Sequence, residues 1–337
     1  MTEHFNYNLS GHNTFGIKAL CRRFLEFDSE DELLYIIGKL TADDFPLLIL
    51  GGGSNLLLTT DYPHTVIRSA IKGYEMKEDD DTIDLRVGSG ETFDDIVALC
   101  TAKGWYGMEN LSLIPGDVGA SAVQNIGAYG AEVKDYITTI EAIEISTGKK
   151  VTLTNADCGY AYRYSKFKDE WKNRYIITYV TYRLSKHFAP KTDYGNVNIF
   201  LSSKGIDHPT PLQLREAIID IRRSKLPDPK EMGNAGSFFV NPIVSKSKFD
   251  ALLRIYPTMP HYILDDDTVK IPAGWMIDTL GWKGKTVGRA GVHDKQALVL
   301  VNRGGASGKE ISDLCEMIRR DVHDTFGIDI KPEVNII

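Results

Sequence analysis

Cysteine is scarce in this sequence, and the few cysteines stand far apart. There are four in 337 residues, with no close pair of the kind that holds a metal ion. We therefore expect no metal site, reduced thiols and a cytoplasmic protein. The four are Cys21, Cys100, Cys158 and Cys315.

Long hydrophobic runs and an excess of basic residues are also missing. The longest apolar runs, such as 47–50 and 297–301, are far too short to cross a bilayer. Residues 1–15 are polar and lack the basic-then-apolar layout of a signal peptide. The formal net charge of −7 argues against nucleic acid or an anionic membrane as a partner, but not against an anionic small molecule. We expect a soluble, globular monomer.

The better-known nucleotide and hydrolase motifs are incomplete. A dinucleotide fingerprint that begins at Gly51 needs a small residue at position 56, which is Leu56. The sequence GKT at 284–286 resembles the end of a phosphate loop, but Thr279 stands where the first glycine belongs. No G-x-S-x-G pattern surrounds Ser237, so a hydrolase triad is not supported.

Two clusters of glycines and other small residues give the strongest positive signal. One is GGGSN at 51–55, and the other is PGDVGASAVQNIGAY at 115–129; each follows an apolar run. Without Cβ atoms, the backbone N–H groups of such loops can approach an anion closely. Two such loops indicate a ligand with an extended phosphate-bearing portion. The sequence therefore predicts a nucleotide or flavin binder of a less common type.

The order of the predicted elements favours an α+β fold of several domains, because strands arrive in hairpin-like groups between isolated helices. The acidic run at 78–81 is predicted to be a hairpin tip, and turn-rich segments predict domain boundaries near 71–73 and 225–234. Capping residues and apolar spacing predict helices that begin near Ser29, Glu91, Thr210, Ser245 and Ser307. The predicted strands are 47–50, 65–68, 82–87, 139–145, 150–153, 175–184, 237–240 and 297–302.

Four further segments carry side chains that suit an anionic ligand. In YAYRYSKF at 160–167, an arginine lies among aromatic residues, although an exposed arginine beside a strand is the alternative. In NAGSFFVNP at 234–242, a serine precedes two aromatic residues, with a turn entering a strand as the alternative. Residues 271–291 combine cations, tryptophans and glycines, which suits phosphate recognition as well as a surface loop. KPEVNII at 331–337 holds a carboxylate, otherwise a surface residue, and an apolar tail that predicts pairing into a sheet.

In their order and spacing, these segments resemble the UDP-N-acetylenolpyruvoylglucosamine reductase family, the flavoenzymes of peptidoglycan precursor synthesis. The resemblance runs nearly from end to end. Tyr194-Gly195 is similar to the substrate-loop tyrosine of the family's longer subtype, whereas Asn335 departs from the basic residue often found two positions after Glu333. The matching segments are NTF (13–15), GGGSN (51–55), IPGDVGASAVQNIGAYG (114–130), YAYRYSKF (160–167), KLPDPK (225–230), NAGSFFVNP (234–242), AGWMID (273–278), GWKGKTVG (281–288) and KPEV (331–334).

The resemblance implies an FAD-binding fold of the vanillyl-alcohol-oxidase (PCMH) type plus a C-terminal substrate-binding domain. FAD would be held non-covalently by residues 1–70, joined by the tail 331–337, and by residues 71–226. Residues 227–330 would bind the UDP-sugar. NADPH would reduce the flavin, and the enolpyruvyl ether of UDP-N-acetylglucosamine would then receive a hydride at C3 and a proton at C2, giving UDP-N-acetylmuramate.

The resemblance also implies the catalytic residues Arg163, Ser237 and Glu333. Hydride addition at C3 pushes electrons toward C2 and the neighbouring carboxylate, so a cation and a proton donor are needed there. Arg163 would supply the cation, Glu333 would be a second partner, and Ser237 would give the proton to C2. A hydroxyl is a weak acid, so Ser237 should need help from a cation such as Lys225 or from an ordered water.

Cofactor-binding and substrate-binding residues are implied in the same way. The two glycine loops would hold FAD, with its pyrophosphate on the backbone N–H groups of 51–55. Lysine and arginine side chains suit a diphosphate, and Tyr194 would close over it as a lid. The cofactor set is Gly51, Gly52, Gly53, Ser54, Asn55, Ile114, Gly116, Gly119, Ala120, Ser121, Asn125 and Gly127; the substrate set is Tyr194, Arg222, Lys225, Asn241, Lys283 and Gln296.

Two other functions stay open at this point. One is another FAD-dependent oxidase or dehydrogenase of the same fold, many of which tether flavin through His or Cys; here Cys158 is the one doubtful candidate. The other is a non-catalytic UDP-sugar or nucleotide-binding module, whose glycine loops only bind and whose purified form would be colourless.

Overall fold

The computed structural model describes all residues 1–337, which form two compact units that are each described by themselves. The three-domain division implied by the resemblance stays a prediction, because the compact units follow different boundaries. The chain passes from one unit to the other at 7/8, 20/21, 52/53, 62/63 and 224/225. Unit 1 comprises Met1–Tyr7, Cys21–Gly52 and Pro63–Ser224, and unit 2 comprises Asn8–Leu20, Gly53–Tyr62 and Lys225–Ile337.

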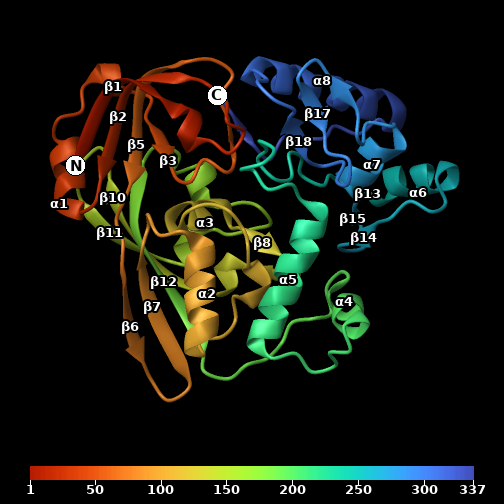
Figure 1. Ribbon diagram of the computed structural model, residues 1–337, viewed down its shortest axis with the longest axis horizontal. Coiled ribbons are helices and arrows are strands. Elements are labelled where there is room, and N and C mark those ends of the chain that lie inside the picture. The colour runs from red at the N-terminus through yellow and green to blue at the C-terminus, as the bar shows by residue number, and fades with distance from the viewer. The chain divides into compact units, whose positions relative to one another are not determined.

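Unit 1 is built on two sheets, shown in Figure 1. The first has the strand order β1-β2-β5-β3, and the second has the order β11-β10-β12-β7-β6 with every neighbouring pair antiparallel. The strands are β1 (Thr2–Asn8), β2 (Leu20–Phe27), β3 (Leu48–Leu50), β5 (Tyr62–Ser69), β6 (Tyr74–Glu78), β7 (Thr82–Gly88), β10 (Ile137–Glu144), β11 (Lys150–Thr154) and β12 (Tyr175–Ser185), with a small hairpin of β8 (Gly127–Ala128) and β9 (Ala131–Glu132).

Unit 1 has five α-helices, and two of them pack against the five-stranded sheet and enclose its main core. Buried side chains of the sheet, such as Val87 and Tyr182, pack with Phe93, Val97 and Val118 from two of these helices. This packing fixes the segment around 116–120 against the sheet. The helices are α1 (Glu30–Ile37), α2 (Phe93–Lys103), α3 (Val118–Gln124), α4 (Val197–Ser203) and α5 (Pro211–Lys225), with short 3-10 helices at Ala42–Asp44, Glu109–Leu111, Val133–Asp135, Ala156–Cys158 and Lys166–Lys168.

Unit 2 contains two three-stranded sheets and one short parallel pair, with strand orders β13-β15-β14, β16-β17-β18 and β19-β4. No helix of the protein is both long and apolar enough to span a membrane. The strands are β4 (Leu56–Leu57), β13 (Ile243–Ser245), β14 (Tyr262–Ile263), β15 (Thr268–Lys270), β16 (Thr286–Val287), β17 (Ala290–Val292), β18 (Leu300–Asn302) and β19 (Asn335–Ile336); the helices are α6 (Lys246–Ile255), α7 (Ala273–Thr279), α8 (Gly308–Phe326) and the 3-10 turn Leu9–His12.

The five predicted helices are confirmed, and their ends follow the predicted capping chemistry. Ser29 accepts a hydrogen bond from the Glu32 N–H at the start of α1, and Ser307 and Glu310 form a capping box at the start of α8. Gly327 ends α8 in the left-handed conformation, at φ 58°. The C-terminal tail also pairs into a sheet as predicted, because β19 runs parallel to β4.

Several elements were missed by the sequence patterns. Strand β1 is exposed at nearly every position, so it lacks the alternation that marks a strand. Helix α3 lies within the glycine cluster, and its residues VGASAVQ have no apolar spacing typical of a helix. Helices α4 and α7 have seven residues each and were also missed. The predicted strand at 237–240 is wrong, because only Phe239 makes an isolated bridge, to Pro332.

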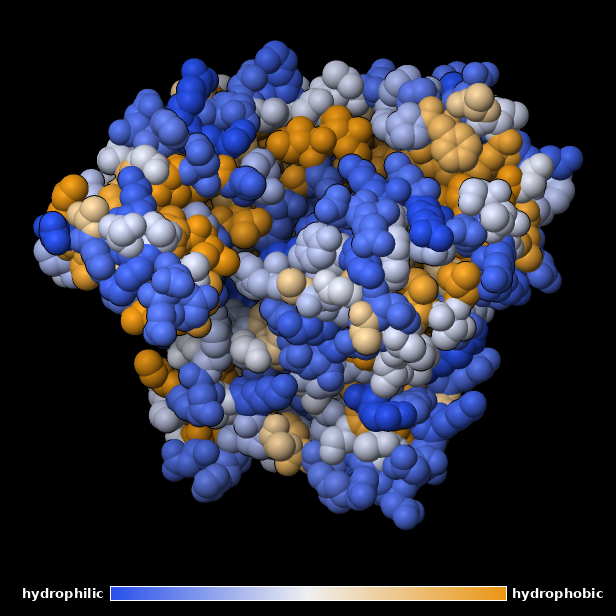
Figure 2. Space-filling model, turned by 180° about the vertical axis from the view of Figure 1, so that it is seen from behind, coloured by the Kyte–Doolittle hydropathy of each residue, from blue (hydrophilic) through white to orange (hydrophobic).

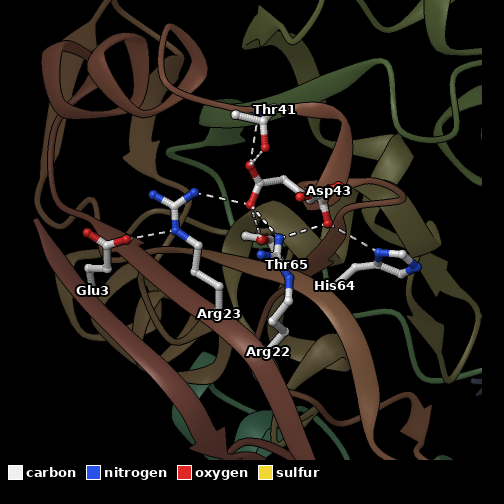
Figure 3. Close-up of polar contacts among 8 residues, drawn as sticks. Glu3, Arg22, Arg23, Thr41, Asp43, His64 and Thr65 are labelled. Atoms are coloured by element: carbon white, nitrogen blue, oxygen red, sulfur yellow. Dashed lines mark hydrogen bonds and ion pairs between the residues drawn. The ribbon is translucent and has the colours of Figure 1, made fainter.

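A buried carboxylate joins three elements of unit 1 (Figure 3). The Asp44 carboxylate accepts hydrogen bonds from Thr65 Oγ1 at 2.5 Å and from the Thr41 N–H at 2.8 Å. Arg22 and Arg23 contact it at 3.0 and 3.1 Å. Burial favours the protonated acid, but these hydrogen bonds outweigh burial and hold the pKa of Asp44 well below its usual range. The cluster therefore ties β2 and β5 to the turn before β3.

The face of the molecule seen from behind is mostly hydrophilic. Figure 2 shows blue side chains over most of the face seen from behind, with hydrophobic side chains in separate patches. In unit 2, Tyr262, Ile263 and Leu264 at β14 are 49%, 66% and 46% exposed. Exposed hydrophobic side chains of this kind are common on folded proteins and carry no function by themselves.

Candidate functional site

The two glycine clusters come together inside unit 1. A Cβ atom on Gly51 would lie 2.8 Å from the Cβ of Ala120, and one on Gly52 would lie 2.9 Å from the Cα of Gly116. Gly119 packs equally tightly, because its Cβ would lie 2.9 Å from the Cβ of Ser89. Contacts this short leave no room for side chains. The loops at 51–52 and 116–120 therefore form one cradle, which we call the glycine cradle.

Asp117 faces the glycine cradle, although the sequence patterns gave it no role. Its Oδ1 would lie 3.2 Å from a Cβ on Gly52, and the residue is only 8% exposed. Burial raises the pKa of the Asp117 carboxyl, while the charges of Arg68 and Lys72 oppose that rise. The Arg68 guanidinium lies 3.8 Å away, so a carboxyl and a cation flank the cradle.

The third glycine of GGGSN belongs to unit 2 and has a structural role there. Gly53 has a φ of +64°, and a Cβ on it would lie 2.0 Å from the carbonyl oxygen of His12. The Thr14 N–H donates to the Gly53 carbonyl at 3.2 Å. In the same unit, the Asn55 side chain donates to the Glu333 carbonyl at 3.2 Å. These contacts explain the NTF motif as the support of the GGGSN loop.

The polar side chains of the implied cofactor set are used inside unit 1. Ser121 Oγ donates to the Val118 carbonyl at 2.7 Å, and the residue is buried. The Asn125 amide donates to Glu132 at 3.0 Å and to the Ala161 carbonyl at 2.8 Å. Both side chains therefore shape the loop. Of the remaining members, Ile114 is half-buried beside the core, Gly127 begins β8, and Ser54 follows Gly53.

Arg163 lies in unit 1 on a strained turn. Its φ is 55°, in the left-handed region that non-glycine residues rarely adopt. The turn is held by a bridge between Ala161 and Tyr164 and by Lys168, whose Nζ donates to the Arg163 carbonyl at 3.0 Å. Strained backbone of this kind persists only where surrounding contacts enforce it, and it clusters at functional sites. The geometry thus singles out the predicted cation.

A second guanidinium, that of Arg222 on α5, lies within the electrostatic reach of Arg163. Burial lowers the pKa of Arg222, the charges of Tyr129 and Asp94 oppose the effect, and the charge of Arg163 adds to it. The Arg222 Nε is closed off from solvent and has no hydrogen-bond partner. A bound anion beside Arg222 would offset burial and favour the charged form of its guanidinium. We call Arg163 and Arg222 of unit 1 the cationic half-site.

Tyr194 also belongs to this part of unit 1. It is 50% exposed, and its Cβ would lie 3.0 Å from a Cβ on Gly130. Gly130 has a φ of +81°, so the close approach depends on glycine. The neighbouring Tyr129 was not assigned by the sequence, and only its place in the GAYG sequence could have indicated it.

Ser237 and Glu333 are brought together within unit 2. The Glu333 N–H donates to the Phe238 carbonyl at 2.8 Å, and the Phe238 N–H donates to the Leu298 carbonyl at 2.7 Å. The segment after Ser237 therefore lies between the tail and the segment before β18. The Ser237 hydroxyl makes no hydrogen bond to another protein group and is partly exposed. It is free to donate to a ligand.

Two predicted substrate residues of unit 2 flank the start of α7. Asn241 Oδ1 accepts from the Ala273 N–H at 2.9 Å, and Gln296 Oε1 would lie 3.5 Å from a Cβ on Gly274. Gln296 Oε1 also accepts from the Leu298 N–H at 3.3 Å, which links it to the Ser237 segment.

The two predicted lysines of unit 2 make no hydrogen bond to these groups. Lys283 Nζ forms an ion pair with Asp278 at 2.5 Å, near the end of α7. Lys225 is exposed at the last position of α5 and makes no hydrogen bond or ion pair with another protein group. The structure therefore gives no support to Lys225 as the group that helps the Ser237 hydroxyl.

Comparisons with known proteins cover both units. A model of the C-terminal domain of UDP-N-acetylenolpyruvoylglucosamine reductase matches residues 228–337, and a model of an FAD binding domain matches residues 22–154. A UDP-N-acetylenolpyruvoylglucosamine reductase from Bacteroides fragilis strain YCH46 is 54% identical over 333 residues, which is 98% of this chain and 99% of the relative. The chain belongs to the UDP-N-acetylenolpyruvoylglucosamine reductase family.

Other members agree along the whole chain. The family's protein from Flavobacterium johnsoniae is 46% identical over 98% of each chain. The solved structure of UDP-N-acetylenolpyruvylglucosamine reductase from Thermus caldophilus is 22% identical, with a TM-score of 0.69, and covers 99% of this chain and 98% of its own. At that identity the structure shows the shared fold. The predicted α+β fold with an FAD-binding part and a C-terminal domain is confirmed.

Proposed function

We propose that this protein catalyses the NADPH-dependent reduction of UDP-N-acetylenolpyruvoylglucosamine to UDP-N-acetylmuramate through bound FAD, a step of peptidoglycan precursor synthesis. The observation that carries this proposal is the 54% identity to a reductase of that name over 98% of the chain. Identity of this extent covers every segment that the resemblance used.

The glycine cradle of unit 1 fits a bound dinucleotide cofactor. Its glycines bring the backbones of 51–52 and 116–120 within contact of each other, and the side chains of Asp117 and Arg68 flank them. The match to an FAD binding domain over 22–154 includes both loops. We assign FAD binding to residues 1–70 with 331–337 and to residues 71–226, and binding of the UDP-sugar to residues 227–330.

The cationic half-site suits the anionic groups of the substrate. Arg163 would bind the carboxylate of the enolpyruvyl group, and Arg222 would bind a second anionic oxygen. Bound FAD supplies the hydride that NADPH provides. As charge develops on the substrate carboxylate, Arg163 would stabilise it best if already in place. The bridge between Ala161 and Tyr164 and the bond from Lys168 hold the backbone of its turn.

Ser237 would give the proton to C2 of the substrate. Its hydroxyl has no competing partner in the protein, and Glu333 is anchored beside it through the Phe238 carbonyl. Since Lys225 makes no hydrogen bond to Ser237, Glu333 or an ordered water is the better candidate to assist the hydroxyl. Asn241 and Gln296, at the start of α7, would contact the UDP part of the substrate, as would Lys283 once it leaves Asp278.

We further propose that the protein acts as a cytoplasmic monomer without nucleic acid or membrane partners. The net charge of −7 and four free, buried cysteines support this proposal. Size-exclusion chromatography with light scattering tests the monomer: a mass near twice 37.6 kDa would overturn it.

The function is tested with the purified protein in two steps. An absorbance spectrum shows whether flavin is bound, and oxidation of NADPH is then followed without oxygen, with and without the enolpyruvyl UDP-sugar. We expect a yellow protein, reduction of one equivalent of flavin by NADPH alone, and continued turnover only with the UDP-sugar.

Other results would identify the alternatives. A colourless protein that binds no added FAD would favour a binding module. If oxygen is then admitted, rapid reoxidation of the reduced flavin with no effect of the UDP-sugar would favour an oxidase of the same fold. Flavin that stays with the acid-precipitated protein would indicate a covalent link and contradict the non-covalent site.

A further inference from the structure

The strongest unassigned group in unit 1 is the buried side chain of Asn110, in the 3-10 helix Glu109–Leu111. Asn110 is 1% exposed. Its Nδ2 donates to the Tyr129 carbonyl at 2.7 Å and to the Lys191 carbonyl at 2.8 Å. These carbonyls lie 19 and 81 residues away along the chain. Both amide hydrogens are thus used to join two distant backbones.

The first of these backbones carries Tyr129, which stands in a strained conformation beside the cationic half-site. Its φ is 47°, although it is not a glycine. Burial raises the pKa of the Tyr129 phenol, and the charge of Arg222 opposes that rise, so the ring and the guanidinium are neighbours. Since left-handed backbone at a bulky residue costs free energy, a strong bond to its carbonyl is needed to hold it.

The second backbone leads into the loop that carries Tyr194. Lys191 is three residues before Tyr194, and its Nζ donates to the Tyr136 hydroxyl at 3.1 Å. Residues 193–196 are exposed, and Val197, the first residue of α4, is buried. The contact of Tyr194 with Gly130 completes a closed path, because Gly130 follows Tyr129. Asn110 therefore supports two features at once. One of its hydrogen bonds holds Tyr129, which neighbours Arg222, and the other holds Lys191 at the start of the Tyr194 loop.

We propose that Asn110 is a positioning residue for substrate binding, which sets the Tyr194 loop and Tyr129 in register with Arg222. The proposal rests on the proposed function, because it assigns Tyr194 and Arg222 to the substrate. Asn110 touches neither the substrate nor the cofactor in this assignment; it acts through the two carbonyls that it binds.

A role in stability alone is the competing explanation, and Asn155 provides a matched control. Its Nδ2 also donates to two backbone carbonyls of unit 1, those of Lys134 and Ile137, at 2.8 and 2.9 Å. Neither carbonyl belongs to the Tyr194 loop or to the cationic half-site. Asn155→Ala therefore removes two hydrogen bonds of the same kind, and neither of them involves a proposed substrate-binding residue.

The test compares Asn110→Ala, Asn110→Asp and Asn155→Ala as FAD-loaded enzymes. We expect Asn110→Ala to raise KM for the UDP-sugar about tenfold, with kcat and the rate of flavin reduction by NADPH within about twofold of the parent. In the isosteric Asn110→Asp, carboxylate oxygens replace the amide donor and face the two carbonyl oxygens. Because acceptors then face acceptors, KM for the UDP-sugar should rise at least as much as in Asn110→Ala. Asn155→Ala should keep the parent's KM.

A double variant separates positioning from general weakening. In a Tyr194→Ala background, Asn110→Ala should raise KM clearly less than in the parent, because part of what it positions is gone. An equal rise in both backgrounds, an unchanged KM, or an equal rise in Asn155→Ala would overturn the proposal. If Asn110→Asp does not fold, Asn110→Ala and the double variant decide.

Failure of the proposed function gives a different result. If the unaltered protein shows no turnover that depends on the UDP-sugar, the proposed function is wrong. If the unaltered protein turns over and the Asn110 variants match its KM, only the assignment of Asn110 is wrong. Binding of the UDP-sugar, followed by its perturbation of the oxidised flavin spectrum, gives a second readout that needs no turnover.

Discussion

The two units present their candidate residues in opposite ways. All six non-glycine residues with positive φ lie in unit 1, and among them are Arg163, Tyr129 and Asn125 of the candidate site. In unit 2, Ser237 and Glu333 stand on segments joined by ordinary backbone hydrogen bonds. Unit 1 thus holds Arg163 on strained backbone and Arg222 on the regular helix α5, and unit 2 holds the neutral hydroxyl of Ser237. The backbone of Arg163 is held by contacts within the protein, whereas the hydroxyl of Ser237 has no hydrogen-bond partner there.

The largest expected effect isolates the chemistry of unit 2. Ser237→Ala removes the proton donor, so kcat for reduction of the UDP-sugar should fall by about 10²–10⁴. Flavin reduction by NADPH should not change, because the residues of unit 1 are intact. Stopped-flow absorbance measures both half-reactions. Ser202→Ala, an exposed serine of α4, serves as the control; a parent-like rate in Ser237→Ala would rule out the assigned role.

The next effect concerns the glycine cradle of unit 1. In Gly52→Ala the new Cβ meets the Gly116 backbone at 2.9 Å, so the two loops must separate. Strain of this kind costs about 1–3 kcal/mol, and the affinity for FAD should fall roughly ten- to a hundredfold. Flavin fluorescence during titration of the apoprotein measures it. Gly11→Ala, which has no neighbour within 4 Å, should bind FAD like the parent.

A comparable effect on substrate alone is expected from the cationic half-site. Arg222→Ala removes a hydrogen-bonding charge from an anion site, so KM for the UDP-sugar should rise roughly ten- to a hundredfold. The affinity for FAD should stay that of the parent. Steady-state kinetics with FAD in excess measures KM. A variant that loses flavin instead would show that Arg222 supports the cradle rather than the substrate.

The smallest effect on activity is expected at Asp44, whose cluster is remote from the assigned residues. Asp44→Asn should lower the free energy of unfolding by about 2 kcal/mol, a figure reduced for the partial exposure of both arginines, and leave kcat unchanged. The pKa of Asp44 is depressed in the folded state, so its contribution is complete above the unfolded value of about 3.9 and is lost as pH falls through the lower folded value.

Urea titrations at several pH values check this prediction. The free energy of unfolding of the parent should fall as the pH is lowered below 5, and that of Asp44→Asn should fall less over the same range. Parallel pH profiles for the two proteins would show that other carboxyls determine the acid sensitivity.

Local patterns in the sequence were enough to predict the elements that carry their own signals. Capping residues located α1, α5 and α8, and β-branched runs located β7 and β12. The glycine loops and the family resemblance named Arg163 and Ser237. What could not be predicted depends on contacts between distant segments. The positive φ of Tyr129 is one example. The two hydrogen bonds from Asn110 Nδ2 are another, because they reach carbonyls 19 and 81 residues away.

The missed strand β1 and the wrong strand at 237–240 have the same cause. Strand β1 exists because β2 pairs with it, not because of its own side chains. Phe238 and Phe239 are buried and look like a strand, but the backbone there makes two bonds to the tail 331–333 and one to Leu298, which amount to an isolated bridge instead of a continuous ladder. Pairing partners, which a single sequence does not reveal, decide such cases.

The pairing of β19 with β4 can form only after nearly the whole chain has been synthesised. The Thr59 hydroxyl donates to the Ile337 carbonyl across 278 residues. At about 5–20 residues per second, the ribosome needs roughly 15–55 s to make that distance. For all that time the segment around Leu56 and Leu57 waits without its strand partner. Residues 8–20 and β4 also belong to unit 2, so a fragment that begins at residue 225 lacks part of that unit and the strand partner of β19.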